Sequence, residues 1–289
     1  MNQGIWYALG AYIIWGLFPL YWKQIQHVPA PQLLGHRVLW SCLILVGILL
    51  LAHQWRTFRD TALQRPIVRI YSAAALLIGF NWLVYVWAVN AGFIIEASLG
   101  YFINPLISIL LGVIFFRERL RPWQWVSIGL AAIGVIYLTF TYGRLPWIAL
   151  TLALSFGLYG LVKKAAPLGS LYGLTLETGL LFLPALIYLV YSERAGQGAF
   201  LHTGAGSDLL MAGAGLITTV PLLMFASAVR RIPLSLVGIL QYITPTLQFL
   251  CGVLIYGEPF SSARLIGFGI VWGGLIVFVM EGFLALRRQ

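Results

Sequence analysis

Apolar stretches of about 20 residues recur along this chain from one end to the other. A helix of that length crosses the roughly 30 Å hydrocarbon core of a bilayer. Inside lipid only helices and closed barrels satisfy every backbone polar group. No segment of this chain alternates polar and apolar residues as a barrel strand does. The sequence therefore predicts an all-α integral membrane protein.

Ten stretches are predicted to span the membrane. They are residues 4–22, 33–52, 70–90, 97–116, 123–141, 146–162, 171–191, 208–229, 236–256 and 264–284. Hydrophobic residues make up 61% of the chain and charged residues 9%, and the longest polar connections are too short to fold independently. The first stretch lacks a basic region before it and a small-residue cleavage site, so it is expected to be a retained span rather than a signal peptide.

The distribution of the basic residues behind the net charge of +10 indicates membrane topology rather than nucleic-acid binding. If the N-terminus is cytoplasmic, most Lys and Arg residues fall in cytoplasmic connections, and the opposite side keeps only Lys23, Arg144, Arg194 and Arg264. The positive-inside rule then predicts that both termini lie in the cytoplasm. The bilayer is the expected partner, and nucleic acid is not. Cys42 and Cys251 lie inside apolar spans, so neither a disulfide nor a metal or other cofactor is expected.

The second half of the chain repeats the first at an offset of 140 residues. Tyr101-Phe102-Ile103-Asn104-Pro105 aligns with Gln241-Tyr242-Ile243-Thr244-Pro245, Glu118 with Glu258, and, after one more residue of shift, Gly16-Leu17 with Gly157-Leu158. Five predicted spans per half place the repeats, 1–141 and 142–289, in opposite orientations around a central cavity. Inverted repeats of this kind are typical of alternating-access transporters.

Pro105 and Pro245 lie about nine residues into their predicted helices, roughly 13 Å at 1.5 Å per residue, which places both near the membrane midplane. A proline disrupts the hydrogen bond to the carbonyl four residues earlier, here that of Tyr101 or Gln241. Such carbonyls need a partner in protein or in a polar cavity. Both prolines are therefore predicted to act as hinges beside a cavity.

Amides, hydroxyls and deep aromatic rings are predicted to line this cavity and to bind a small organic molecule. They are Trp15, Asn81, Trp82, Tyr85, Tyr101, Asn104, Tyr159, Thr218, Thr219, Gln241, Tyr242 and Thr244. For each, the alternative is helix packing or an interhelical hydrogen bond with no ligand. Tryptophans near span ends, among them Trp22, are assigned to the interfacial belt.

Arg37 and Glu177 are the ionisable residues well inside spans, and His36 adjoins the arginine. Such groups are costly in lipid and are candidates for charge recognition or coupling. The repeat aligns the two, but inversion places them at different depths. Arg37 is therefore expected to attract anions or to gate the outer mouth, and Glu177 to bind a proton or cation near the inner one. Local pairing or snorkelling is the alternative. Glu96 is expected at a water-exposed helix end.

Four motifs resemble the RarD-type branch of the EamA transporter family, within the drug/metabolite transporter superfamily. They are His36-Arg37-Val38-Leu39-Trp40-Ser41, the segment 96–106, Tyr159-Gly160-Leu161-Val162-Lys163-Lys164 and Gln241-Tyr242-Ile243-Thr244-Pro245-Thr246. The resemblance implies a bacterial inner-membrane permease of ten helices in two EamA repeats. A family name that refers to chloramphenicol sensitivity hints at export of drugs or metabolites.

Other classes of function are less compatible with the sequence. The chain contains no HExxH or GxSxG motif and no paired carboxylates at one depth, so it is not expected to be an enzyme. It contains no GxxxxGK[ST] loop for ATP-driven transport. A passive channel or a non-transporting scaffold stays open, as does the choice among uniport, proton antiport and proton symport. A monomer suffices for the mechanism, and the sequence does not predict the oligomeric state.

Overall fold

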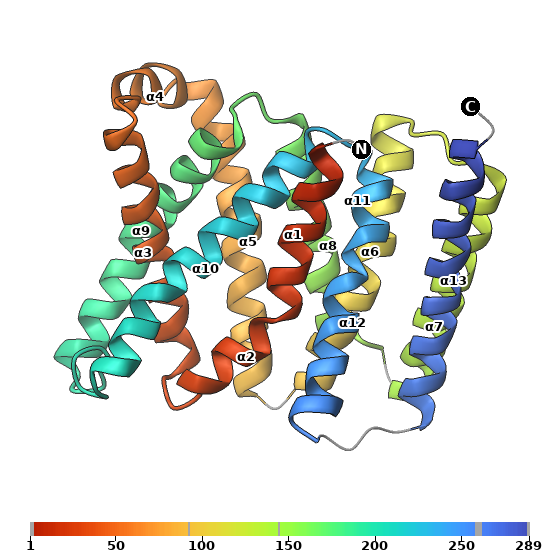
Figure 1. Cartoon of the computed structure of the whole chain (residues 1–289). Helices are drawn as coiled ribbons and strands as arrows, with labels where there is room; N and C mark the ends of the chain where they lie inside the picture. Colours follow the sequence, from red (N-terminus) through yellow and green to blue (C-terminus); the bar gives the residue numbers. More distant parts are fainter. Residues whose placement is uncertain (1–2, 92, 144, 258–261, 288–289) are drawn as a thin grey trace.

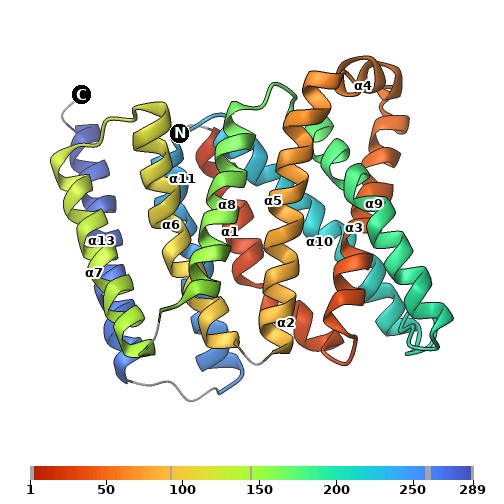
Figure 2. The same cartoon turned by 180° about the vertical axis from the view of Figure 1, so that it is seen from behind.

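The computed structural model describes residues 3–91, 93–143, 145–257 and 262–287, so Arg144 and Glu258 lie outside the described residues. Within these ranges all regular elements are helical (Figures 1 and 2). They are α1 (Gln3–Gly16), α2 (Phe18–Trp22), η1 (Lys23–Ile25), α3 (Ala30–Leu51), α4 (Trp55–Ala62), α5 (Arg65–Asn90), α6 (Ile94–Phe116), α7 (Pro122–Tyr142), α8 (Trp147–Ala165), α9 (Ser170–Arg194), α10 (Ala205–Val229), α11 (Leu234–Gln241), α12 (Ile243–Leu250), the π-helical turn η2 (Cys251–Ile255) and α13 (Ser262–Arg287).

The helices confirm a multi-pass membrane protein. Among the described residues, 9 helical segments are long and apolar enough to cross a bilayer. Large apolar side chains face outward, as Leu51 and Phe140 do with 84% and 81% of their surface exposed. The tenth predicted span corresponds to α13, whose apolar stretch Leu265–Glu281 is shorter than the others. The count of ten spans therefore stays a prediction.

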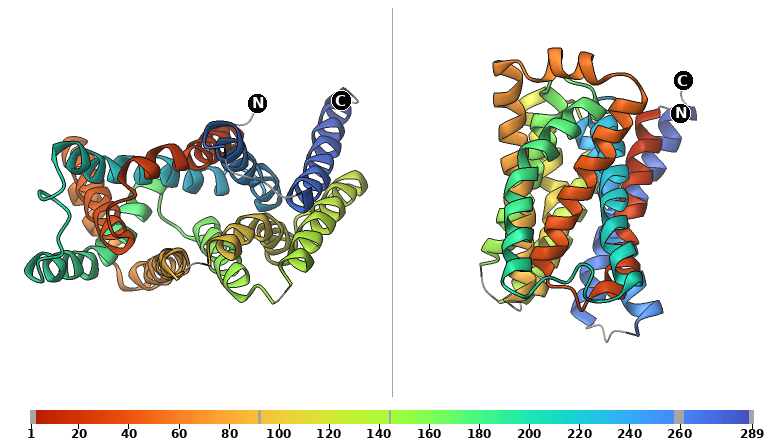
Figure 3. Two further views of the ribbon diagram at one scale, coloured as in Figure 1. Left: turned by 90° about the horizontal axis from the view of Figure 1, so that it is seen from below. Right: turned by 90° about the vertical axis from the view of Figure 1, so that its left-hand side faces the viewer.

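The helices form two layers, which are seen almost end-on from below (Figure 3). One layer contains α1, α10, α11 and α12, and the other contains α5, α6 and α8. The helices α3 and α9 pack together at one edge, and α7 packs against α13 at the other. The start of α1 and the end of α13 lie at the same end of the molecule, here called the terminal end (Figure 1).

Local sequence explains where helices stop. Pro122 occupies the first position of α7, where its missing N–H costs nothing, and Gly143 follows the helix with a φ of 81°. A left-handed residue of this kind is the commonest way to end a helix. The first and ninth predicted spans are interrupted instead. The first breaks at Leu17, just before Pro19, and the ninth breaks at Tyr242, just before Pro245.

The largest buried cluster joins the two halves of the sequence. Tyr12 and Ala74 from the first half pack with Tyr159, Phe225 and others from the second. Because the two halves of the sequence share this core, they pack together as one unit. The cavity described next lies between the same two layers.

Candidate functional site

A cavity of about 390 Å³ lies between the layers, toward the end of the molecule away from the terminal end. Its walls come from both halves of the chain. The lining residues are Trp15, Phe18, Pro19, Trp22, Arg37, Asn81, Trp82, Tyr85, Ala97, Ser98, Gly100, Tyr101, Asn104, Leu152, Phe156, Leu222, Gln241, Thr244, Pro245, Gln248, Gly252 and Tyr256. Aromatic rings and a few amides dominate this surface, as in most sites for small organic ligands.

The structure brings most of the predicted cavity residues together. Trp15, Asn81, Trp82, Tyr85, Tyr101, Asn104, Gln241 and Thr244 line the cavity, as do Pro245 and Arg37. Other predicted site residues are buried but lie outside its lining: Tyr159, Thr218, Thr219, Tyr242, His36 and Glu177. Pro105 is also outside the lining, one residue beyond Asn104. The predicted residues thus come from helices that surround the cavity, and the direction of each side chain decides which of them line it.

Arg37 projects from α3 into the cavity between two indole rings. Its Cζ lies 5.2 Å from the centroid of the Trp22 ring and 5.0 Å from that of Trp82. Both distances suit cation–π attraction. Its Nε donates a hydrogen bond to Thr218 Oγ1 at 2.9 Å. These contacts hold the guanidinium in the cavity wall. Thr218 is outside the lining and affects the cavity through its hydrogen bond to Arg37.

The amides of the cavity differ in how they are satisfied. Asn81 Nδ2 donates to Leu152 O at 2.8 Å and to Ser155 Oγ at 2.9 Å, which ties α5 to α8. Asn104, by contrast, is only 4% exposed, and its Oδ1 has no hydrogen-bond partner among the described residues. A buried polar atom without a partner is rare and costly. Asn104 therefore has an unused acceptor in the wall of the cavity, whereas the Asn81 amide nitrogen joins two helices.

Two broken helices place backbone carbonyls beside the cavity. Pro19 has no N–H to donate to Trp15 O, and Gln248 Nε2 donates to that carbonyl instead at 3.2 Å. Thr244 Oγ1 donates to Tyr12 O at 3.0 Å, so α12 is bonded twice to α1. The ninth span is divided into α11 and α12 before its π-helical turn η2, a feature that is frequent at functional sites. In contrast, α6 continues through Pro105 without a break.

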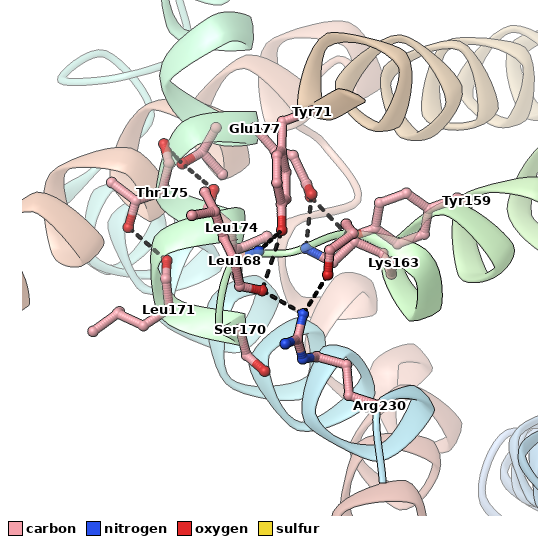
Figure 4. Close-up of polar contacts among 12 residues, drawn as sticks. Tyr71, Tyr159, Lys163, Leu168, Ser170, Leu171, Leu174, Thr175, Glu177 and Arg230 are labelled. Atoms are coloured by element: carbon pink, nitrogen blue, oxygen red, sulfur yellow. Dashed lines mark hydrogen bonds and ion pairs between the residues drawn. The ribbon is translucent and has the colours of Figure 1, made fainter. Parts of the chain in front are cut away.

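Buried polar contacts join helices near the terminal end (Figure 4). Glu177 of α9 accepts hydrogen bonds from Lys163 Nζ at 2.7 Å and from Tyr159 OH at 3.0 Å, both on α8. Beside this group, Tyr71 OH of α5 donates to Leu168 O at 3.2 Å and accepts from Leu168 N at 3.1 Å. Glu177 therefore does not pair with Arg37, and its partner is a lysine on the neighbouring helix.

A second group of contacts joins three helix ends at the same side. Glu118, just after α6, accepts hydrogen bonds from the backbone N–H groups of Leu234 at 2.6 Å and Ser235 at 2.8 Å, at the start of α11. Lys164 at the end of α8 lies 3.5 Å from Glu118. Burial raises the pKa of the Glu118 carboxyl, but the hydrogen bonds from Ser235 and Leu234 and the charge of Lys164 outweigh it, so the pKa is lowered.

The remaining predicted residues lie between helices. The His36 ring packs 5.0 Å from the Phe200 ring, and its Nδ1 has no partner among the described residues. The Thr219 and Tyr242 hydroxyls are likewise buried without one. The expectation that Glu96 is exposed to water is wrong. Its side chain is 1% exposed and accepts a hydrogen bond from Ile148 N, because the start of α8 covers it.

Some lining residues were not predicted from sequence. Trp22, assigned to the interfacial belt, faces Arg37 because the chain bends at Leu17 and turns α2 over the cavity. Phe156, Gln248 and Tyr256 also line it. Gln248 lies one helical turn beyond Thr244, so its position on α12 is the signal that would have found it. Nothing in the sequence distinguishes Trp22 from the other tryptophans at span ends.

Comparison with known proteins extends these observations. The family model described as the EamA-like transporter family matches residues 2–140 and again residues 145–280. The chain is 46% identical over 97% of its length to an uncharacterized transporter, YojE, of Bacillus subtilis, covering 94% of that protein. It is 44% identical to Protein RarD of Streptomyces exfoliatus, over 100% of this chain and 91% of that one. It is 43% identical to Protein RarD of Escherichia coli, over 99% and 97%.

A solved structure supports the same fold. A chain described only as a crystal structure of a protein superposes with a TM-score of 0.72, at 18% identity, over 96% of this chain and 97% of that chain. Together with the relatives, this similarity agrees with the many apolar helices and the interior cavity. The chain therefore belongs to the EamA-like transporter family, is similar along its whole length to proteins named RarD, and is a multi-pass membrane transporter.

Proposed function

We propose that this protein is a secondary transporter that moves a small organic molecule by alternating access. The observation that carries the proposal is the cavity between the two layers, whose walls come from equivalent segments of both halves. Tyr101 and Asn104 line it from α6, and Gln241 and Thr244 line it from α11 and α12. These four residues are two pairs at the 140-residue offset of the repeat.

Close helix contacts support an inverted repeat of five spans per half. A Cβ added at Gly16 would lie 2.6 Å from Leu247 Cβ, and one added at Gly157 would lie 2.6 Å from Ile107 Cγ2. Gly157 is the repeat equivalent of Gly16, and Ile107 that of Leu247. Each contact therefore joins opposite halves, and exchange of the halves converts one into the other.

The helix pair α7 and α13 also has contacts that exchange of the two halves converts into one another. A Cβ at Gly134 of α7 would lie 2.8 Å from Val271 Cγ2, and one at Gly274 of α13 would lie 2.7 Å from Ser127 O and 3.3 Å from Ala131 N. Gly274 and Gly134 are equivalent, as are Val271 and Ala131. This pattern is expected of halves related by a pseudo-twofold axis, and it supports α13 as the tenth span. The two successive family matches support the same division of the chain.

The two ends of the molecule differ, as alternating access requires. The cavity reaches Trp22 and Tyr256 at one end, whereas the buried contacts of Glu177 and Glu118 join helices at the other. With both termini cytoplasmic, as the positive-inside rule favours, this arrangement is an outward-facing state in an inner membrane. Rocking of one half against the other would then expose the cavity to the cytoplasm. We infer export as the direction, and a monomer suffices.

Counterflow in proteoliposomes tests the proposal. The purified chain is assayed with radiolabelled amino acids, aromatic metabolites and amphenicol drugs. A carrier gives saturable uptake that is accelerated by the same solute on the opposite side. Flux that rises linearly with concentration and is unaffected by solute on the other side would show a channel, and the absence of flux for every solute would favour a non-transporting scaffold.

A further inference from the structure

The cavity contains a positive charge with no protein counter-charge. Arg37 is the charged member of its lining, and no Asp or Glu appears among the described lining residues. Among the described residues, no carboxylate forms an ion pair with Arg37, and the one hydrogen bond that its guanidinium donates to another described residue comes from Nε. An arginine carries its charge permanently and has five N–H donors. Its Nη groups are therefore left for another partner.

We infer that the substrate is an aromatic carboxylate without an ammonium group, bound by its carboxylate to the Nη groups of Arg37. This inference rests on the proposed transport function and names the substrate class. The planar guanidinium matches a carboxylate with two parallel hydrogen bonds. An uncompensated charge within the membrane is energetically unfavourable. Binding of an anionic ligand lowers the electrostatic free energy of this charge.

The walls select the body of the ligand. Trp22 and Trp82 flank the guanidinium, and Tyr85 and Tyr101 meet edge to face with centroids 6.0 Å apart. Rings on several sides favour a flat aromatic group. The volume of about 390 Å³ lies within the usual range for small-molecule pockets.

The unpartnered Asn104 Oδ1 adds a second polar requirement. Asn104 belongs to the same lining, and a rotation of its side chain would turn the buried Oδ1 toward a ligand that donates one hydrogen bond. A hydroxyl on the aromatic ring supplies that donor while the carboxylate faces Arg37. Hydroxybenzoates combine the two groups and serve as probes of the site.

The same lining argues against amines and zwitterions. An ammonium group needs a carboxylate or several carbonyl oxygens when it leaves water. Beside Arg37 it would meet a like charge, which opposes binding in a desolvated site. An ordinary amino acid is therefore expected to bind less well than the corresponding acid without its amino group.

Binding to the purified full chain in detergent is the primary test. Tryptophan fluorescence is suited to it because Trp22 and Trp82 flank the proposed carboxylate site. The probes are 4-hydroxybenzoate, its neutral amide 4-hydroxybenzamide, the cation tyramine and the zwitterion tyrosine. We expect saturable quenching by 4-hydroxybenzoate and at least tenfold weaker binding of the other three.

Variants assign the charge to Arg37. Arg37→Gln is expected to weaken 4-hydroxybenzoate binding by roughly 30-fold or more, the lower end of what loss of one partner of a buried charge pair costs. Arg194→Gln is the matched control, because it removes a positive charge from an exposed side chain in the last turn of α9, outside the lining. It is expected to leave binding unchanged. If Arg37→Gln does not fold, Asn104→Ala tests the site instead. This variant is expected to bind benzoate and 4-hydroxybenzoate with equal affinity.

The outcomes separate the inference from the proposed function. Equal binding of the acid and its amide, or unchanged binding in Arg37→Gln, overturns the anion site. Failure of 4-hydroxybenzoate to bind the wild-type chain overturns it too. Binding with the expected pattern but without trans-stimulated flux in proteoliposomes supports the site and contradicts the transport function. Trans-stimulated flux of neutral solutes alone supports transport and contradicts the substrate class.

Discussion

Lys163 and Glu177 form an ion pair inside the membrane, with Nζ and Oε1 2.7 Å apart and side chains that are 2% and 1% exposed. At the 141-residue shift that aligns Gly16 with Gly157, Lys163 corresponds to Trp22, and at the 140-residue offset Glu177 corresponds to Arg37. Trp22 and Arg37 meet through a cation–π contact at the opposite end. The same pair of repeat positions thus holds two opposite charges near the terminal end and a single charge beside the cavity.

Removing one partner of the buried pair is expected to destabilise the protein. Lys163→Met leaves the Glu177 carboxylate buried without its counter-charge, at a cost of about 3–5 kcal/mol. The double variant Lys163→Met with Glu177→Leu is expected to lose much less, because it removes both charges. Unfolding of the purified protein in mild detergent measures both. Equal losses in the single and double variants would show that the pair contributes packing rather than charge.

Glu177 is also our candidate for proton coupling. Gln cannot release a proton, so Glu177→Gln is expected to abolish the acceleration of transport by a pH gradient. Solute exchange measured in the absence of a gradient is expected to be unchanged. Flux in proteoliposomes with and without an imposed gradient measures the two. Full gradient-driven transport by this variant would exclude Glu177 from coupling.

Acid is expected to weaken the contact of Glu118 with the start of α11. Its pKa is lowered in the folded protein, so this stabilisation is complete above the unfolded value of about 4.3 and is lost as the pH falls through the lower folded value. Glu118→Ala is expected to lower stability at pH 7 by about 1–3 kcal/mol, the cost of leaving buried donors unpaired. Thermal unfolding between pH 3 and 7 should show less acid sensitivity in the variant. An unchanged pH profile would contradict this role.

The close approach of α7 and α13 is tested by glycine substitution. Gly134→Val places methyl groups against Val271 and Gly267 O and is expected to cost about 1–3 kcal/mol. Gly129→Val on the same helix is the control, since a Cβ there meets nothing within 4 Å. Thermal stability in detergent is the measurement, and equal effects at both positions would argue against tight packing at Gly134. Gly274→Val should behave like Gly134→Val if the halves are equivalent.

The midplane amides are expected to matter for transport more than for folding. Asn104→Ala and Gln241→Ala each remove a polar group from the cavity lining, and we expect transport to fall roughly tenfold with normal membrane insertion. Thr139→Ala is the control, because the hydroxyl bonds, within the described part of the chain, to Val135 O of its own helix and to no other helix. Flux per inserted protein is the readout. Normal flux in both amide variants would remove them from the site.

The sequence by itself determined the membrane class and nearly all the helices. A span must be apolar over the thickness of the hydrocarbon core, and its backbone polar groups must be hydrogen-bonded within a helix. The spans can therefore be predicted from local composition. Pro245 likewise predicts the break of the ninth span, because a proline acts on the carbonyl four residues before it.

Only the tertiary structure decided which polar side chains face the cavity and which face each other. Tyr159 and Tyr101 both looked like lining residues, but Tyr159 donates to Glu177 on a neighbouring helix. The partner of Glu177 and the position of Trp22 beside Arg37 depend on helix rotation and on the bend at Leu17. In a membrane the apolar pattern surrounds each helix, so periodicity does not fix its rotation. Packing between helices sets that rotation and thereby the site.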